Sequence, residues 1–236
     1  MSKAVIFFAP GLEECEGLLC VDLLRRSGVE VTIAAVGGEK IVKSARSISV
    51  VADALAEELD YSAFDAAILP GGIPGVDNLK ADATVRKVCT VPLIVKLSPQ
   101  AENIPEMCRA VEAAGADAIS LTNTFQACAI DLEKRRPVFN NIFAGLSGPA
   151  VRPIALRMVW QAVGAVNIPV VGLGGIATGR DALEFIMAGA TAVQVGAANF
   201  ANPRAMETIA NEMAAWMDKN GVKTLDEIRG CARHTE

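Results

Sequence analysis

The sequence predicts an α/β protein in which short buried strands alternate with helices. Apolar residues make up 52 % of the 236 residues and charged residues 21 %, so the chain can bury an extensive core and is not disordered. Short apolar runs rich in β-branched residues indicate buried parallel strands, and longer segments of helical periodicity separate them. These observations together predict repeated βαβ units.

The expected strands are continuous apolar runs without the polar alternation of an exposed sheet. In chain order they are 4–9, 29–36, 66–69, 93–97, 118–121, 170–173 and 192–195. Residues 41–52 predict an additional antiparallel hairpin, because two alternating stretches flank the polar segment 44–47. The expected helices are 12–27, 76–88, 103–114, 150–163, 180–188, 203–220 and 225–228, punctuated by glycines after their ends and prolines in their first turns.

Composition excludes several classes of function. The net charge is −5 and aromatic residues make up 5 %, which argues against nucleic-acid binding. The single histidine, His234, argues against a Ser-His-Asp triad or a multi-histidine metal site. Because no signal peptide or membrane span is evident, we expect a cytoplasmic protein with no membrane partner. The six cysteines lack metal-ligand spacing, and we expect most of them to be reduced core residues.

Small and polar residues follow four of the expected strands, where a parallel sheet or barrel places its ligands. They are Lys96, Asn123 with Thr124, Gly174 with Gly175, and Gly196. Glycine backbone N–H groups, aimed by the helix N-termini that follow, can hold a phosphate. Glycines that only permit tight turns are the alternative for any one position; the combination with Lys96 favours a phosphate site.

These strand ends lie in a segment, residues 89–236, that resembles the C-terminal half of class 1 dihydroorotate dehydrogenases, which are FMN-dependent (β/α)8 barrels. The stretches that carry the resemblance are VPLIVKLSP, AGADAISLTNT, AIDLEKRRPVF, GLSGPAVRPIALRMV, IPVVGLGGI, DALEFIMAGATAVQVG and ANF. They follow one another in the order and spacing of that family.

The resemblance implies a role for each matching position. Lys96 would contact the flavin ring and Gly148 would lie along the ribityl chain. Gly174, Gly175, Gly196 and Ala197 would hold the FMN phosphate, a site that phosphate or sulfate could also occupy. Asn123 and Thr124 would face orotate. The sequence departs from the family at Ala197, where threonine is usual, and at Thr122, where a branched apolar residue is usual.

The resemblance assigns no catalytic residue here. In bacterial relatives a cysteine, or in some branches a serine, removes the substrate proton, and it belongs to the half of the barrel that the resemblance does not cover. Cys128 is the cysteine nearest to the expected site, and we interpret it as a packing residue. We therefore expect flavin or phosphate binding without turnover.

Residues 1–88 resemble a different family, the DJ-1/ThiJ/PfpI group with its flavodoxin-like sheet of order 2-1-3. The carriers are AVIFFAPGLEECEGLLCVDLLRRSGVEVTIAAV, the hairpin with Ser44, Ala45 and Arg46, and FDAAILPGGIPGVDNL. In that family the glutamate at the position of Glu16 hydrogen-bonds a reactive cysteine, to which the resemblance does not extend. We therefore expect Glu16 to act as a helix-start carboxylate, and we expect Cys15 and Cys20 to be buried.

The two resemblances predict a hybrid barrel-like α/β fold that combines a flavodoxin-like fragment (1–88) with a half TIM barrel (89–236), packed as one domain. The second strand could close against the last one, and the hairpin could add an eighth strand or plug an end. Exposed barrel edges could instead pair in a homodimer. An engineered chimera with a residual flavin or phosphate site is the leading interpretation. An inert scaffold, a dihydroorotate dehydrogenase-like oxidoreductase and a DJ-1-like protein are the alternatives.

Overall fold

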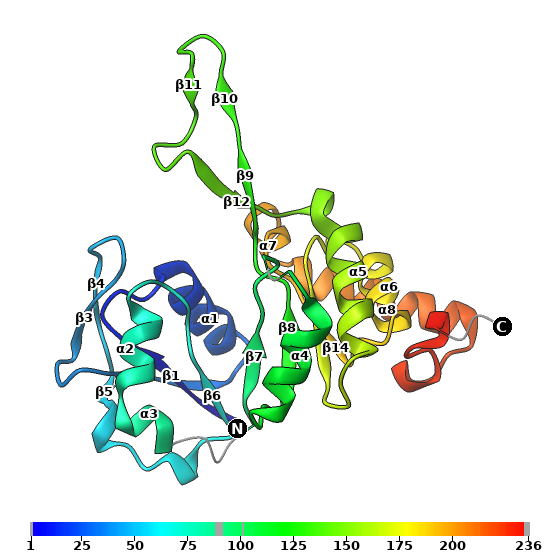
Figure 1. Ribbon diagram of the computed structural model, residues 1–236. Coiled ribbons are helices and arrows are strands. Elements are labelled where there is room, and N and C mark those ends of the chain that lie inside the picture. The colour runs from blue at the N-terminus through cyan, green and yellow to red at the C-terminus, as the bar shows by residue number, and fades with distance from the viewer. Residues whose placement is uncertain (1, 88–91, 101, 234–236) are drawn as a thin grey trace. The chain divides into compact units, whose positions relative to one another are not determined.

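A computed structural model describes residues 2–87, 92–100 and 102–233 of the chain. The chain divides into two compact units, Met1–Leu93 (unit 1) and Ile94–Glu236 (unit 2). Both have the mixed α/β character with parallel sheets that the sequence predicts (Figure 1). The expected boundary between residues 88 and 89 lies outside the described residues, as does His234.

Unit 1 is built on a parallel sheet in which each face carries its own apolar cluster. Its strand order is β5-β2-β1-β6. The strands are β1 (Lys3–Phe8), β2 (Glu30–Ala35), β5 (Ala54–Leu55) and β6 (Ala66–Ile68). Along β1, Ile6 and Phe8 pack into one buried cluster, whereas Val5 and Phe7 pack into another. Burial on both faces is the reason that β1 is a continuous apolar run.

The remaining elements of unit 1 are a hairpin and short helices. They are β3 (Ile41–Lys43), β4 (Ser49–Val51), α1 (Glu14–Arg26), α2 (Gly75–Ala81), α3 (Ala83–Lys87) and the 3-10 turns η1 (Ala56–Glu58) and η2 (Tyr61–Ala63). The antiparallel hairpin is confirmed. The single helix expected over 76–88 is wrong within the described residues, because Asp82 separates α2 from α3 and its Oδ1 accepts hydrogen bonds from the N–H groups of Thr84 and Val85.

The edges of this sheet also differ from expectation. The order 2-1-3 is present as β2-β1-β6. The other edge of β2 pairs with β5, through Ala34 with Ala54 and Ala35 with Leu55. The expected closure of the second strand against the last one is therefore wrong at this edge. The hairpin β3-β4 forms a separate two-stranded sheet, so it does not extend the main sheet as an eighth strand.

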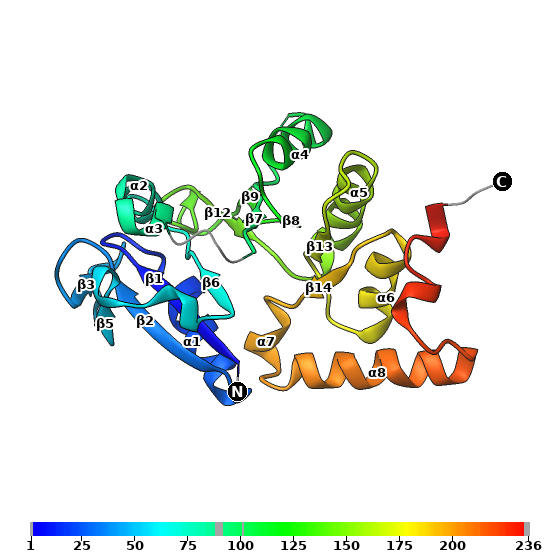
Figure 2. The same ribbon diagram turned by 90° about the horizontal axis from the view of Figure 1, so that it is seen from below.

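Unit 2 contains a second parallel sheet of order β14-β13-β8-β7, in which neighbouring strands succeed one another along the chain and crossover connections join them. Its strands are β7 (Ile94–Lys96), β8 (Ala118–Leu121), β13 (Val170–Leu173) and β14 (Ala192–Gln194). Its helices are α4 (Ile104–Ala113), α5 (Arg152–Val163), α6 (Gly179–Met187), α7 (Ala198–Ala201) and α8 (Ala205–Asn220), with 3-10 turns η3 (Pro149–Val151), η4 (Leu225–Glu227) and η5 (Cys231–Arg233). Figure 2 shows α4, α5 and α6 side by side along this sheet.

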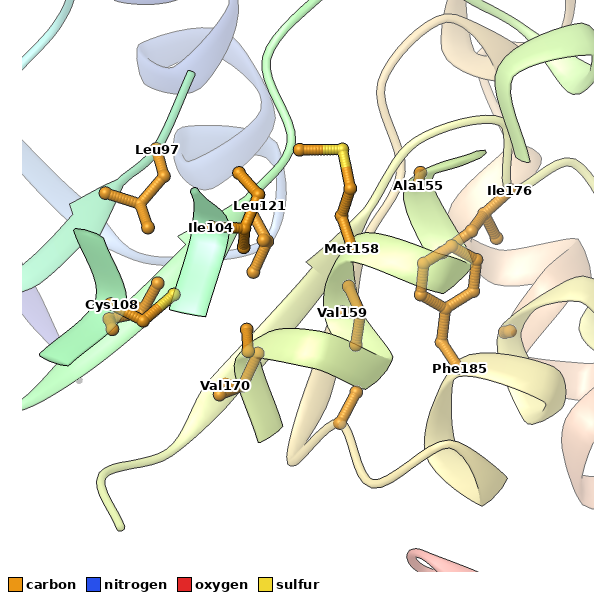
Figure 3. Close-up of a cluster of buried hydrophobic side chains, with 14 of the residues drawn as sticks. Leu97, Ile104, Cys108, Leu121, Ala155, Met158, Val159, Val170, Ile176 and Phe185 are labelled. Carbon is orange, nitrogen blue, oxygen red and sulfur yellow. The ribbon is translucent and has the colours of Figure 1, made fainter. Parts of the chain in front are cut away.

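The core of unit 2 fills the space between the sheet and these helices (Figure 3). Leu121 and Val170 contribute from the strands, and Met158 and Phe185 from α5 and α6. A Cβ atom on Gly172 would lie 2.5 Å from the Phe185 ring, so the bare backbone of β13 lets the ring pack directly on the strand. Complete burial of such a ring contributes about 1.5–3 kcal/mol.

An antiparallel arm that the sequence pattern does not predict follows β8. It comprises β9 (Phe125–Cys128), β10 (Ile130–Asp131), β11 (Arg136–Pro137) and β12 (Phe143–Leu146), with β9 paired to β12 and β10 to β11. The arm extends away from the sheet of its own unit (Figure 1). Cys128 is exposed on it, so its interpretation as a packing residue is wrong.

The other described cysteines also differ from the expectation of core thiols. Cys108 is buried, but Cys15 and Cys231 are exposed and Cys20 is half-buried. Cys15 points away from the core because α1 buries the side containing Gly17 and Val21.

Candidate functional site at the carboxyl ends of the unit 2 strands

The parallel register of unit 2 brings the predicted residues to one edge of the sheet. Lys96 is the register partner of Ser120, and Leu173 is the partner of Gln194. Beyond the strand ends, the Thr122 N–H donates to the Leu173 carbonyl at 2.8 Å. The Asn123 N–H donates to the Leu97 carbonyl at 3.2 Å. These bonds hold the segment after β8 between the ends of β7 and β13.

The glycine loop after β13 meets the turn that contains Gly148. Gly174 and Gly175 have φ values of +133° and +73°, which side-chain-bearing residues rarely adopt. A Cβ atom on Gly175 would lie 2.7 Å from the Gly148 carbonyl oxygen and 2.8 Å from the Arg152 backbone nitrogen. The fold therefore requires a glycine at position 175, and the structure brings Gly148 and Gly175 together from positions far apart in the sequence.

Gly196 differs from these two glycines because the fold gives no steric reason for it. It follows β14, is exposed, and has no positive φ. The nearest atom to a Cβ built on it is Cδ1 of Leu173, at 4.0 Å. Ala197, the next residue, is half-buried and precedes the four-residue helix α7. The surface at Gly196 is open to a ligand that needs close access to the backbone.

The helix N-terminus that follows the glycine loop is already occupied by side chains. Asp181 Oδ2 accepts the N–H groups of Ala177 and Thr178, at 3.0 and 2.9 Å, and the Thr178 hydroxyl accepts the Asp181 N–H at 3.2 Å. The Gly179 N–H donates to Glu212 at 2.6 Å. The N–H groups of Ala177, Thr178, Gly179 and Asp181 at the N-terminus of α6 are therefore already paired. Donors for an anion would have to come from the glycine backbone.

Arg152 places a positive charge beside this loop, and sequence reasoning missed it. Its side chain is half-buried and pairs with Asp181 and, at 3.3 Å, with Glu184. The ion pair ties α5 to the capping residue of α6. It also compensates the charge of Arg152, so the loop does not depend on an external anion for neutralisation. A local pattern could have revealed the TGRD capping box, but not the arginine that completes it.

Asn123 and Thr124 line an open polar pocket of about 280 Å³. Its wall includes Ser98, Gln100, Asn123, Thr124, Gln126 and Phe143. Both predicted side chains are exposed. A Cβ atom on Gly145 would lie 2.9 Å from the Thr124 hydroxyl oxygen, so β12 packs closely against that residue. Among the described residues, the lining of this pocket contains no cysteine, histidine, lysine or carboxylate, and it offers hydrogen bonds from amide and hydroxyl groups.

In unit 1, Glu16 has a specific partner that the helix-start interpretation did not foresee. Its Oε2 accepts the backbone N–H of Gly71 at 2.8 Å. A Cβ atom on Gly71 would lie 2.4 Å from that oxygen, so glycine is required there. Glu13 caps α1 by accepting the Glu16 N–H at 2.8 Å. The charge of Glu13, burial and the charge of Glu14 raise the pKa of the Cys15 thiol, which disfavours a reactive thiolate.

Neither a membrane-spanning helix nor a metal-binding cluster is present among the described residues. No helix there is both long and apolar enough to span a membrane. No group of three or more His, Cys, Asp or Glu side chains in that part of the chain could hold a metal ion.

The curated proteins that this chain resembles include catalytic subunits of dihydroorotate dehydrogenase B. A catalytic subunit of dihydroorotate dehydrogenase B from Petrotoga mobilis is 59 % identical over 146 residues, which are 62 % of this chain and 49 % of that protein. The corresponding subunit from Geobacter sulfurreducens is 49 % identical over 196 residues, covering 81 % of this chain and 64 % of that protein. The chain spans about half the length of most of these curated relatives.

One solved dihydroorotate dehydrogenase agrees with this chain at the level of the fold. A dihydroorotate dehydrogenase from Eimeria tenella, solved with ferulenol, superposes with a TM-score of 0.57 at 18 % identity, covering 88 % of this chain and 63 % of that one. Toxoplasma gondii DJ-1 aligns over 51 % of the chain at 26 % identity with a TM-score of 0.36.

The family model for dihydroorotate dehydrogenase matches residues 27–217. The match therefore begins well before the boundary expected between residues 88 and 89. It includes all four strand ends of the candidate site. On this match, the chain belongs to the dihydroorotate dehydrogenase family.

Proposed function

We propose that the chain binds FMN at the strand-end edge of unit 2. Lys96 would contact the flavin ring and Gly148 the ribityl chain, and the backbone at Gly174, Gly175, Gly196 and Ala197 would hold the phosphate. The observation that carries this proposal is the open surface at Gly196, where a side chain would be tolerated by the fold but would fill space that a phosphate needs. The contact of Gly175 with Gly148 supports it, because it joins the two loops that one ligand would have to span.

Bound FMN would supply a hydride acceptor. The residues of this chain would orient the reactants: the amide of Asn123 and the hydroxyl of Thr124 offer hydrogen bonds to a planar, polar substrate of the orotate class in their pocket. Among the described residues, the pocket lining holds no cysteine, carboxylate or amine to accept a proton, and its hydroxyl groups are those of Ser98 and Thr124. We therefore propose flavin and orotate binding as the function, without dihydroorotate turnover by the described residues alone.

Dihydroorotate oxidation is the second candidate, because the curated relatives are catalytic subunits of dihydroorotate dehydrogenase B. The two candidates differ in one step, the reduction of bound flavin by dihydroorotate. Anaerobic mixing of the FMN-loaded chain with dihydroorotate separates them: bleaching of the visible flavin absorbance supports the oxidoreductase, and an unchanged absorbance supports binding alone.

The binding test uses the full purified chain. FMN is added, the excess is removed by gel filtration, and the visible flavin spectrum of the protein peak is recorded. We expect retained flavin and a spectral shift on addition of orotate. Asn123→Ala should abolish the orotate shift and leave the flavin in place, since the residue lines only the substrate pocket. A colourless protein of unchanged compact size would refute FMN binding.

The engineered chimera, with its hybrid barrel-like fold packed as one domain, stays a proposal. The order β2-β1-β6 in unit 1 supports a flavodoxin-like fragment. Calorimetry of the whole chain tests the packing: one cooperative unfolding transition is expected for a single domain and two for independent units. Sedimentation would test the proposed homodimer through exposed strand edges, such as that of β7, where Ile94 is 53 % exposed.

A further inference from the structure

The candidate site contains a buried hydroxyl group with no role in the fold. Thr122 follows β8 directly and is 3 % exposed, and its Oγ1 has no hydrogen-bond partner. Buried polar atoms are nearly always paired, so an unpaired one beside the candidate site needs an explanation. Two other buried oxygens in the described part of the chain lack a partner, those of Glu14 and Asn199. Glu14 belongs to unit 1, and the Asn199 side chain is already held by donating to the Val195 carbonyl at 2.8 Å.

The hydroxyl lies beside the glycine loop. Its oxygen is 3.5 Å from the point that a Cβ atom on Gly174 would occupy, and the same point is 2.6 Å from the Ala155 Cβ. The Thr122 backbone is held in place by its hydrogen bond to Leu173, whereas the side chain makes no hydrogen bond.

We propose that Thr122 is a positioning residue for the flavin, and that its hydroxyl forms a hydrogen bond with a polar atom of the ligand held at the Gly174–Gly175 loop. The inference rests on the proposed FMN binding and adds a residue to it. The hydroxyl can donate or accept, so it suits the phosphate, the ribityl hydroxyls and the polar edge of the ring alike. The bond forms when the ligand enters, because the hydroxyl in the free protein has nothing to bond to.

The test compares the full chain with Thr122→Val and Thr122→Ser. Valine keeps the shape and removes the hydroxyl, and serine keeps the hydroxyl. Dissociation constants for FMN and for riboflavin, which lacks the phosphate, are measured by quenching of flavin fluorescence, and the melting temperature of each ligand-free protein is recorded. Thr122→Val should weaken FMN binding about tenfold, the effect of one lost hydrogen bond, with a melting temperature equal to or above that of the parent. Thr122→Ser should bind within roughly twofold of the parent.

The riboflavin arm locates the bond. An equal loss for both ligands in Thr122→Val supports a bond to the ring or ribityl chain, and a loss confined to FMN supports a bond to the phosphate. Unchanged FMN affinity in Thr122→Val overturns the inference while the proposed function stands. An equal loss in Thr122→Ser also overturns it, because the methyl group would then be what matters. A parent chain that binds neither flavin overturns the inference and the proposed function together.

Discussion

Gly175 and Gly196 separate a glycine that the fold needs from one that a ligand needs. Both follow strands of the same sheet and both belong to the proposed phosphate site. Gly175 has φ +73° and backbone atoms within 2.8 Å of a Cβ position, whereas the nearest atom at Gly196 is 4.0 Å away. Alanine at position 175 should therefore lower the stability of the fold. Alanine at position 196 should leave the stability unchanged and weaken FMN binding.

The magnitudes follow from this geometry. At position 175, alanine costs about 1–2 kcal/mol for the left-handed backbone, and its contact with the Gly148 carbonyl oxygen forces a shift that adds about 1–3 kcal/mol. A loss of about 2 kcal/mol or more lowers the melting temperature by roughly 4–8 °C for a chain of this size. At position 196, alanine should change the free energy of unfolding by about 0.5 kcal/mol or less. Its methyl group should weaken FMN binding about tenfold.

Thermal unfolding and FMN titration of the two variants provide the check. We expect Gly196→Ala to melt with the parent and bind FMN poorly, and Gly175→Ala to melt early. A Gly196→Ala protein that binds FMN as the parent does would refute the assignment of that surface to the phosphate. A Gly175→Ala protein with unchanged melting would show that the loop can relax, and the steric reasoning would be wrong.

Three further predictions concern stability and titration. Asp181→Ala should lower the free energy of unfolding by about 1–3 kcal/mol, because the N–H groups of Ala177 and Thr178 lose their acceptor and Arg152 loses one of its two partners. An unchanged urea midpoint would contradict this. Burial first, then the charges of Asp82 and Glu57, raise the pKa of Tyr61 to about 12. The contribution of the Tyr61 phenol to stability is therefore complete below the unfolded pKa of about 10 and is lost as pH rises towards 12. Ultraviolet titration of this single tyrosine tests the prediction, and phenolate formation near pH 10 would contradict it. Burial raises the pKa of the Cys108 thiol, so a thiol reagent should label exposed Cys231 in the native protein and Cys108 only after unfolding; early labelling of Cys108 would refute its burial.

The sequence by itself determined where the buried strands of unit 2 lie. Residues 118–121 and 170–173 were predicted with the bounds that the structure has, since a strand covered on both faces must be a continuous apolar run. Because parallel strands end at a common edge, the residues that follow them, such as Asn123 and Gly174, were predicted to lie along that edge. The arm over residues 125–146 escaped prediction because its exposed strands bury too little apolar surface to leave a pattern.

Only the tertiary structure decided which donors and acceptors are already used. Glu212 takes the Gly179 N–H from 33 residues away, and Glu16 takes the Gly71 N–H from 55 residues away. Such bonds depend on the path of the chain between the partners, and no local periodicity encodes that path. The same holds for the unpaired hydroxyl of Thr122, whose lack of a partner is a property of everything packed around it. Hydrophobic pattern predicts elements because burial acts on each residue locally, whereas the pairing of polar atoms is determined by long-range geometry.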